Sequence, residues 1–132
     1  MEPFRSGQYL TLRIGSHDFA IEAGCIRGIL ASHEVASAES SAAWLVGSAT
    51  LRGQSFPVID LRVKLGLRHG SQGRNPSIVV VETGSGLAGF FADRVSEIIY
   101  ARAHEYRGGK IRIGRPREIL DPKSVLLEPA TL

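Results

Sequence analysis

The chain has 132 residues, of which 43% are hydrophobic and 22% are charged, so it is long enough to bury a core of its own and does not have the composition of a disordered protein. Its single cysteine, Cys25, excludes an internal disulfide and a cysteine-rich zinc site. The four histidines never recur at helical spacing, and no apolar run has the length of a signal peptide or a membrane span. We therefore expect a cytoplasmic protein that holds no metal ion.

The net charge of +3 conceals an uneven distribution. Seven basic and three acidic residues lie between Arg102 and Lys123, which gives that segment a charge of +4 and leaves −1 for the rest of the chain. The basic character therefore belongs to one segment and not to the whole surface.

The first elements of the chain predict a hairpin. Apolar side chains at positions 10, 12 and 14 alternate with polar ones, which is typical of a half-buried strand over residues 9–14. Residues 15–18 have the composition of a turn, and residues 19–21 resume an extended pattern.

The middle of the chain predicts short elements. Residues 22–30 indicate a helical turn that runs into a strand, and the Ala- and Ser-rich residues 31–43 indicate an exposed loop. The strand that follows contains Pro57, which cannot donate to a ladder, so we expect an edge or a bulge at this residue. Asp60 can then cap one short helix that Gly66 ends.

The last third predicts a second hairpin over residues 78–92, a strand over residues 95–100, and a helix that starts at Asp121-Pro122 and runs to residue 127. In total the chain indicates about seven short strands at a spacing near ten residues, as in small barrels or a sandwich. No segment is long enough for a crossover helix, which argues against an α/β fold.

Catalytic chemistry finds little support in the sequence. Residues 84–89 spell G-x-G-x-x-G, but the chain continues as a strand where a dinucleotide site needs a helix, so we interpret them as a hairpin turn. Asp60 has no second carboxylate nearby in sequence, and a structural cap is its expected role. Cys25 fits a place in the core. We therefore predict that the protein is not an enzyme.

The basic segment leaves two alternatives open. It could bind single-stranded nucleic acid through a patch of Arg112, Arg115 and Arg117, with Tyr100 and Tyr106 as stacking partners. It could equally form a solvated strand face whose arginines serve contact with another protein.

One central motif is specific enough to identify a family. It consists of Leu51-Arg52-Gly53, Pro57, Ile59-Asp60-Leu61-Arg62 and Lys64-Leu65-Gly66. The motif resembles the signature of the CheW-like chemotaxis coupling proteins. Residues 9–29, the hairpin 78–99 with Gly89 and Ala92-Asp93-Arg94-Val95, and Ile119-Leu120-Asp121-Pro122 agree with the same family in order and spacing.

The resemblance implies a fold, a role and a set of partners. The fold is all-β with short helices, built from two small intertwined five-stranded, SH3-like barrels around a common core. We expect a single domain of this kind over residues 8–128, with tails at 1–7 and 129–132. Members of the family are adaptors without catalysis or cofactor. They dock the helical signalling tip of a chemoreceptor and couple it to the regulatory domain of a CheA-type histidine kinase. They do so within membrane-associated arrays but do not insert into the membrane. Other CheW-like proteins are further partners. Nucleic acid is not an expected partner of the family.

Individual roles are implied for residues that match the family's positions. The receptor-facing residues are Ile26, Arg52, Gly53 and Ile78. The residues that serve the motif and the fold are Gly47, Pro57, Asp60, Arg62, Gly66 and Gly89. Gly53 would permit a tight turn with positive φ, and that turn would hold Arg52 exposed for a carboxylate or a helix C-terminus.

The chain also departs from the family pattern. Ser48-Ala49-Thr50 replaces the usual residues before Leu51, and Gly28 stands where a glutamate is frequent. The stretch between Tyr100 and Ile119 is short, and it carries the basic cluster in place of an acidic, proline-rich connection. An adaptor that keeps receptor binding and has lost kinase binding is therefore an alternative within the family.

Overall fold

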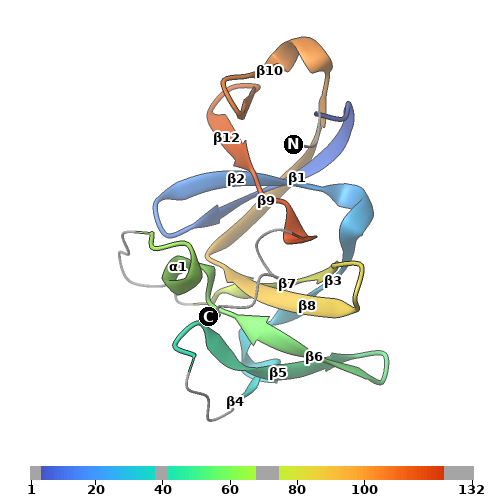
Figure 1. Cartoon of the computed structure of the whole chain (residues 1–132), viewed down its shortest axis with the longest axis vertical. Coiled ribbons are helices and arrows are strands. Elements are labelled where there is room, and N and C mark those ends of the chain that lie inside the picture. Colours follow the sequence, from blue (N-terminus) through green and yellow to red (C-terminus); the bar gives the residue numbers. More distant parts are fainter. Residues whose placement is uncertain (1–3, 38–41, 68–74, 124–132) are drawn as a thin grey trace.

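The computed structural model describes residues 4–37, 42–67 and 75–123, which fold into two six-stranded β-sheets joined by short turns and helices (Figure 1). The first sheet has the spatial order β10 (Tyr106–Arg107), β11 (Lys110–Arg112), β12 (Pro116–Ile119), β2 (His17–Glu22), β1 (Gly7–Ile14) and β9 (Arg94–Ala101). The second has the order β3 (Ile26–Ala31), β7 (Ser77–Glu82), β8 (Leu87–Ala92), β6 (Gln54–Ile59), β5 (Leu45–Leu51) and β4 (Ala36–Ser37). The helices are α1 (Leu61–Lys64) and the 3-10 turns η1 (Ala23–Cys25), η2 (Ser32–Glu34) and η3 (Ala103–Glu105).

Most neighbouring strands in both sheets are antiparallel. β1 and β2 form a hairpin closed by the two-residue turn Gly15-Ser16, in which Gly15 has φ 61°. β9 lies on the other side of β1 with a bulge in its first half. Each sheet also contains one parallel pair, β12 beside β2 and β6 beside β8, which ties distant parts of the chain together.

The two sheets share one hydrophobic core. It is formed by side chains of β1 and β2, which include Leu12 and Phe19, packed against side chains of β7 and β8, which include Val79 and Phe90. Each sheet has in addition a smaller cluster on its other face. Strand β7 is buried on both faces, which explains its uninterrupted run of β-branched residues.

The all-β class with short helices and two sheets confirms the predicted fold class. The expected five strands per sheet are present, but each sheet gains a two-residue edge strand, β10 or β4, so the count of five was wrong by one. Strands this short carry no periodicity that a sequence could reveal. Part of the loop expected over residues 31–43 is likewise ordered, because it contains η2 and β4.

Three further expectations have definite outcomes. The strand at residues 9–14 was predicted to be half-buried, but both of its faces are covered, because Tyr9 and Thr11 lie in the first sheet's own interior. Pro57 lies in an inner strand, not an edge strand, yet β6 pairs with β8 only at Val58 and Ile59, so the proline stands just outside that ladder. The helix expected at residues 121–127 falls largely outside the described residues.

Candidate functional site

The turn between β5 and β6 places Arg52 at the tip of a hairpin. Leu51 pairs with Gln54, which leaves a two-residue loop in which Arg52 has φ 51° and Gly53 has φ 82°. Positive φ at both central residues is the geometry of a type I′ turn, and the positive φ predicted for Gly53 is confirmed. A residue with a Cβ loses about 1–2 kcal/mol in this conformation. Arg52 is the one non-glycine residue with positive φ in the described part of the chain, and its side chain is exposed.

The hairpin tip lies beside strand β3. The side chain of Leu51 packs over Gly28, so that a Cβ added at Gly28 would stand 3.3 Å from Leu51 Cδ2. The second sheet therefore curls until β3 approaches the end of β5, although these strands are not hydrogen-bonded neighbours. The glycine that departs from the family pattern leaves room for this contact.

Two motif glycines permit close approach of other chain segments. A Cβ on Gly47 would lie 2.0 Å from the carbonyl oxygen of Ala36 in β4, and a Cβ on Gly89 would lie 2.9 Å from Ile78 Cγ2 and 3.0 Å from Phe56 Cε1. Real Cβ atoms do not come so near to other heavy atoms. Gly47 thus allows β4 to join the sheet, and Gly89 allows β8 to pack on the cluster beneath it.

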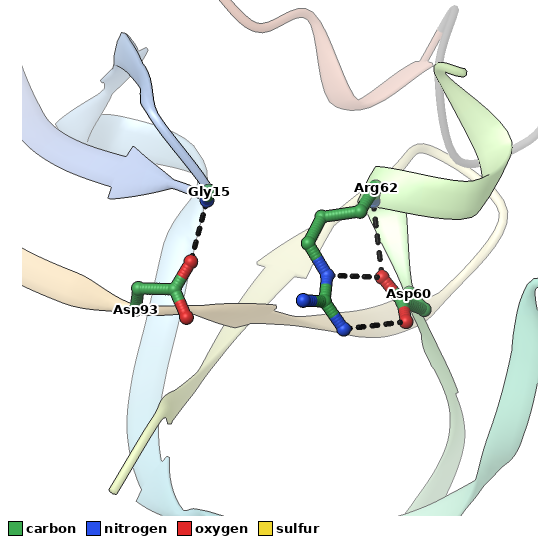
Figure 2. A network of polar contacts seen from close by, with 4 residues as sticks. All are labelled: Gly15, Asp60, Arg62 and Asp93. Carbon is green, nitrogen blue, oxygen red and sulfur yellow. Dashed lines mark hydrogen bonds and ion pairs between the residues drawn. The ribbon is translucent and has the colours of Figure 1, made fainter. Parts of the chain in front are cut away.

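The remaining motif residues hold α1 in place. Asp60 accepts a hydrogen bond from the backbone N of Arg62 at 3.0 Å and forms an ion pair with the Arg62 guanidinium at 3.3 Å (Figure 2). Gly66, with φ 65°, ends the helix, since its N–H donates to Val63 O and the N–H of Leu67 donates to Arg62 O. The capping role expected of Asp60 and the terminating role of Gly66 are confirmed.

Asp93, in the segment Ala92-Asp93-Arg94-Val95 that also agrees with the family, plays a similar structural part. Its carboxylate accepts a hydrogen bond from the backbone N of Gly15 (Figure 2). Its own N–H donates to the carbonyl of Arg13. Both carboxylates of Figure 2 are thus engaged by the backbone or by Arg62, which accounts for them without catalysis.

The apolar residues expected to face a receptor do not share one environment. Ile26 opens β3 and is partly buried against the shared core. Ile78 is 0% exposed inside the second sheet's own cluster, so its assignment as a receptor-facing residue is wrong: its side chain reaches no surface. Alternation along β7 puts Ile78 on the inner face of its sheet.

Two exposed isoleucines that the sequence did not single out lie on the end strands of the two sheets. Ile29 of β3 is 48% exposed and Ile98 of β9 is 57% exposed. Their cross-strand partners, Val79 and Leu10, both belong to the shared core, and paired residues project to the same face. Ile29 and Ile98 therefore extend the shared core to the surface. We group Ile26, Ile29, Arg52 and Ile98, from β3, the β5–β6 turn and β9, under the name candidate docking surface; that one partner contacts them together is proposed below. A periodicity argument missed Ile29 and Ile98 because apolar residues on a strand are normally assigned to the interior.

The three arginines of the predicted basic patch have separate structural uses. Arg112 donates to the carbonyl of Arg107, Arg117 donates to the carbonyl of Ile113, and Arg115 pairs with Asp18 at 3.4 Å. Arg112 and Arg117 also lie on opposite faces of the first sheet, because Arg117 is paired with Ile111 and shares its face, whereas Arg112 is the next residue after Ile111.

The proposed stacking residues already make contacts of their own. Tyr106 stacks on Phe4 with ring centroids 4.7 Å apart, and Arg102 covers Tyr100 at 5.3 Å. These contacts speak against the nucleic-acid alternative for the basic segment, which needs cations interleaved with free aromatic rings.

Cys25 does not have the environment of a nucleophile. Burial raises the pKa of its thiol to about 11, and the nearby carboxylate of Glu22 adds to this. Its Sγ donates to the carbonyl of Glu22 at 3.1 Å.

Within residues 4–37, 42–67 and 75–123 no cluster of three or more histidine, cysteine or carboxylate side chains could hold a metal ion. Among the described residues, no helix has the length and apolar character needed to span a bilayer.

Comparison with known proteins places these features in one family. The model of the CheW-like domain matches residues 8–121. The chain is 33% identical over 92 residues to the chemotaxis protein CheW of Helicobacter pylori, which covers 70% of this chain and 56% of that protein. It is 26% identical over 100 residues to CheW of Klebsiella aerogenes, with coverage of 76% and 60%.

A solved structure agrees with the fold. The scaffolding protein TtCheW from Thermoanaerobacter tengcongensis matches with a TM-score of 0.68 at 19% identity, over 77% of this chain and 66% of that one. The chain spans less than two thirds of the length of the curated relatives named above. The predicted domain end at residue 128 lies outside the described residues. The family-model match over residues 8–121 includes every described strand, except that β1 begins one residue earlier, at Gly7. The chain belongs to the CheW-like domain family.

Proposed function

We propose that this protein is a non-enzymatic, cytoplasmic adaptor of a bacterial chemosensory array that docks the helical signalling tip of a chemoreceptor and couples it to a CheA-type histidine kinase. The observation that carries the proposal is the match of the CheW-like family model over residues 8–121. The names of the relatives, chemotaxis protein CheW and scaffolding protein TtCheW, support the same role.

The candidate docking surface suits a helix of the receptor. An amphipathic helix binds through apolar anchors spaced along one face, and Ile29 and Ile98 offer such contacts at the margin of the shared core. Arg52, held outward by its turn beside β3, adds a cation that can meet a carboxylate or the carbonyl end of a helix. The strain accepted at Arg52 supports a role in binding, because a glycine or asparagine would make the same turn more easily.

The test is a calorimetric titration of the protein at physiological salt with a receptor signalling-tip fragment and, separately, with the regulatory domain of the cognate kinase. We expect binding to both. Arg52→Glu and Ile29→Asp should each weaken receptor binding by about tenfold or more. Arg107→Glu is the matched control, since it reverses an exposed arginine on the first sheet and should leave receptor binding unchanged.

The outcomes separate the alternatives. Binding to the receptor fragment alone would establish the receptor-only adaptor, with the lost surface in the altered region between residues 100 and 119. Binding to neither partner would overturn the proposal. Normal receptor binding by Arg52→Glu would remove Arg52 from the docking surface while leaving the adaptor role intact.

A further inference from the structure

Strand β9 ends the first sheet, and its outer edge has no partner strand in the part of the chain that the structure describes. Within the described residues it pairs with β1 alone. The bulge in its first half interrupts the ladder near Ser96 and Glu97, whereas the second half, from Ile98 to Tyr100, carries no charge and no proline. Natural edge strands are usually guarded by charges, proline or bulges, so this second half is an unguarded edge.

The direction of the backbone groups along β9 follows from two independent contacts. In the β1–β2 hairpin, Ile14 and His17 flank the two-residue turn and form a hydrogen-bonded pair. Hydrogen-bonded and non-hydrogen-bonded pairs alternate along the two strands. Leu10 therefore turns its backbone N–H and C=O toward β2, and Tyr9 turns its own toward β9. Tyr9 is opposite Ile99, which therefore faces β1. Ile98 and Tyr100 consequently direct their N–H and C=O groups away from β1.

The side chain of Thr11 gives the same answer. Its Oγ1 donates to the carbonyl of Glu97 at 3.0 Å and accepts from the N–H of Glu97 at 3.1 Å. Glu97 thus faces β1 with both backbone groups, and the next residue, Ile98, must face outward. The two residues whose backbone groups point to the free edge also have the exposed apolar side chains, since Ile98 is 57% and Tyr100 is 53% exposed.

We propose that β9 pairs with β9 of a second copy of this chain, antiparallel and centred on Ile99, so that the first sheets of two copies join into one continuous sheet. In this register Ile98 of one copy is opposite Tyr100 of the other, and each pair exchanges two hydrogen bonds. All outward groups of both residues are then satisfied, and the exposed apolar side chains meet across the junction. Ser96 comes to lie opposite Arg102 and Glu97 opposite Ala101, so no like charges face each other.

Neighbouring registers are less favourable for reasons visible in the chain. Centring on Ile98 would place Tyr100 opposite Ser96, inside the bulge. Centring on Tyr100 would place Ile98 opposite Arg102, whose N–H already donates to the Glu105 carboxylate at 2.8 Å. The edge is therefore self-complementary about Ile99, which is why we assign a second copy as its occupant. The inference goes beyond the proposed function and does not depend on it.

The first experiment is sedimentation velocity of the full chain over micromolar to sub-millimolar concentrations. Wild type is expected to show a concentration-dependent monomer–dimer equilibrium. Tyr100→Pro removes an outward N–H that makes no hydrogen bond within the described monomer. Because the change is present in both copies, the dimer loses two hydrogen bonds, and association should weaken by at least about tenfold. Tyr100→Thr, which loses the same ring but keeps the N–H, is the matched control and should retain more of the association. Circular dichroism verifies that both variants are folded.

A cross-linking experiment tests the register in a Cys25→Ser background with oxidised glutathione as oxidant. Ile99→Cys places the two sulfur-bearing residues on the two-fold axis with Cα atoms about 4.5 Å apart, within the range of a disulfide. Ile98→Cys separates its copies by roughly 8 Å, too far for a bond. We expect a covalent dimer from Ile99→Cys alone. A protein that stays monomeric at every concentration, a dimer that Tyr100→Pro leaves unchanged, or cross-linking through Ile98→Cys alone would overturn the proposal.

Discussion

The strained arginine at the β5–β6 turn offers a way to separate stability from binding. Asparagine tolerates the left-handed conformation far better than arginine does, and Asn-Gly is the preferred sequence of a type I′ turn. Arg52 has φ 51°, which costs a residue with an ordinary side chain about 1–2 kcal/mol. Recovering roughly half of this cost, Arg52→Asn should raise the free energy of unfolding by about 0.5–1 kcal/mol and the Tm by roughly 2–6 °C. The same change should weaken binding of a receptor-tip fragment by about tenfold, because it removes the cation.

The assay pairs urea unfolding, followed by circular dichroism, with the calorimetric titration of the receptor fragment. Arg27→Asn is the matched control: Arg27 is an exposed arginine in β3 whose φ is not positive, so the substitution should gain no stability. A lower urea midpoint for Arg52→Asn would refute the assignment of strain to this turn. A more stable variant that binds the receptor fragment as tightly as wild type would refute the reason given for keeping an arginine there.

Three other changes have defined outcomes. Gly47→Ala forces a Cβ against the Ala36 carbonyl oxygen, so the free energy of unfolding in urea should fall by about 1–3 kcal/mol. Gly24→Ala, which has open space around it, is the control and should stay near wild type. Equal stabilities of the two variants would contradict the close approach at Gly47. Asp60→Ala removes the cap of α1 and should cost about 1–2 kcal/mol in the same assay, and a neutral result would deny the cap its role. Burial holds the pKa of the Cys25 thiol at about 11. Alkylation by iodoacetamide at pH 8 should therefore be roughly 100-fold slower than in the urea-unfolded chain, and its rate should keep rising up to about pH 11. Equal rates in the folded and the unfolded chain would exclude the burial effect.

The elements that sequence reasoning predicted well are those with a local physical cause. The β1–β2 and β7–β8 hairpins have turns rich in glycine between alternating or β-branched runs, and α1 has a capping aspartate and a terminating glycine five residues after its first residue. Each of these signals acts within a few residues, so no knowledge of the partner strand is needed. The same holds for the type I′ turn, where Gly53 alone indicated positive φ.

What the sequence could not reveal depends on contacts between distant segments. Ile78 and Ile98 are both isoleucines in strands, yet one is fully buried and the other is more than half exposed. The difference arises because β7 lies inside its sheet with both faces covered, whereas β9 ends its sheet. The arginines of the basic segment were likewise indistinguishable in sequence, but Arg115 pairs with Asp18 of β2, a residue far from it in the chain. Strand order, and with it the exposure of a given side chain, is a property of pairings that no local pattern encodes.

The two proposed surfaces overlap at Ile98, and this overlap makes a prediction of its own. A receptor helix that packs on the Ile98 side chain, and a second copy that pairs with the edge of β9, cannot occupy the same strand at once. Binding equilibria that exclude each other are linked reciprocally, so the receptor-tip fragment should convert dimer to monomer, and raising the protein concentration should weaken the apparent affinity for the fragment. Sedimentation velocity with increasing amounts of fragment measures the conversion of dimer to monomer. Tyr100→Pro should still bind the fragment, but its apparent affinity should no longer depend on the protein concentration. If the fragment binds the dimer without changing its population, the receptor helix docks away from β9, and Ile29 with Arg52 on the second sheet would have to carry the contact alone.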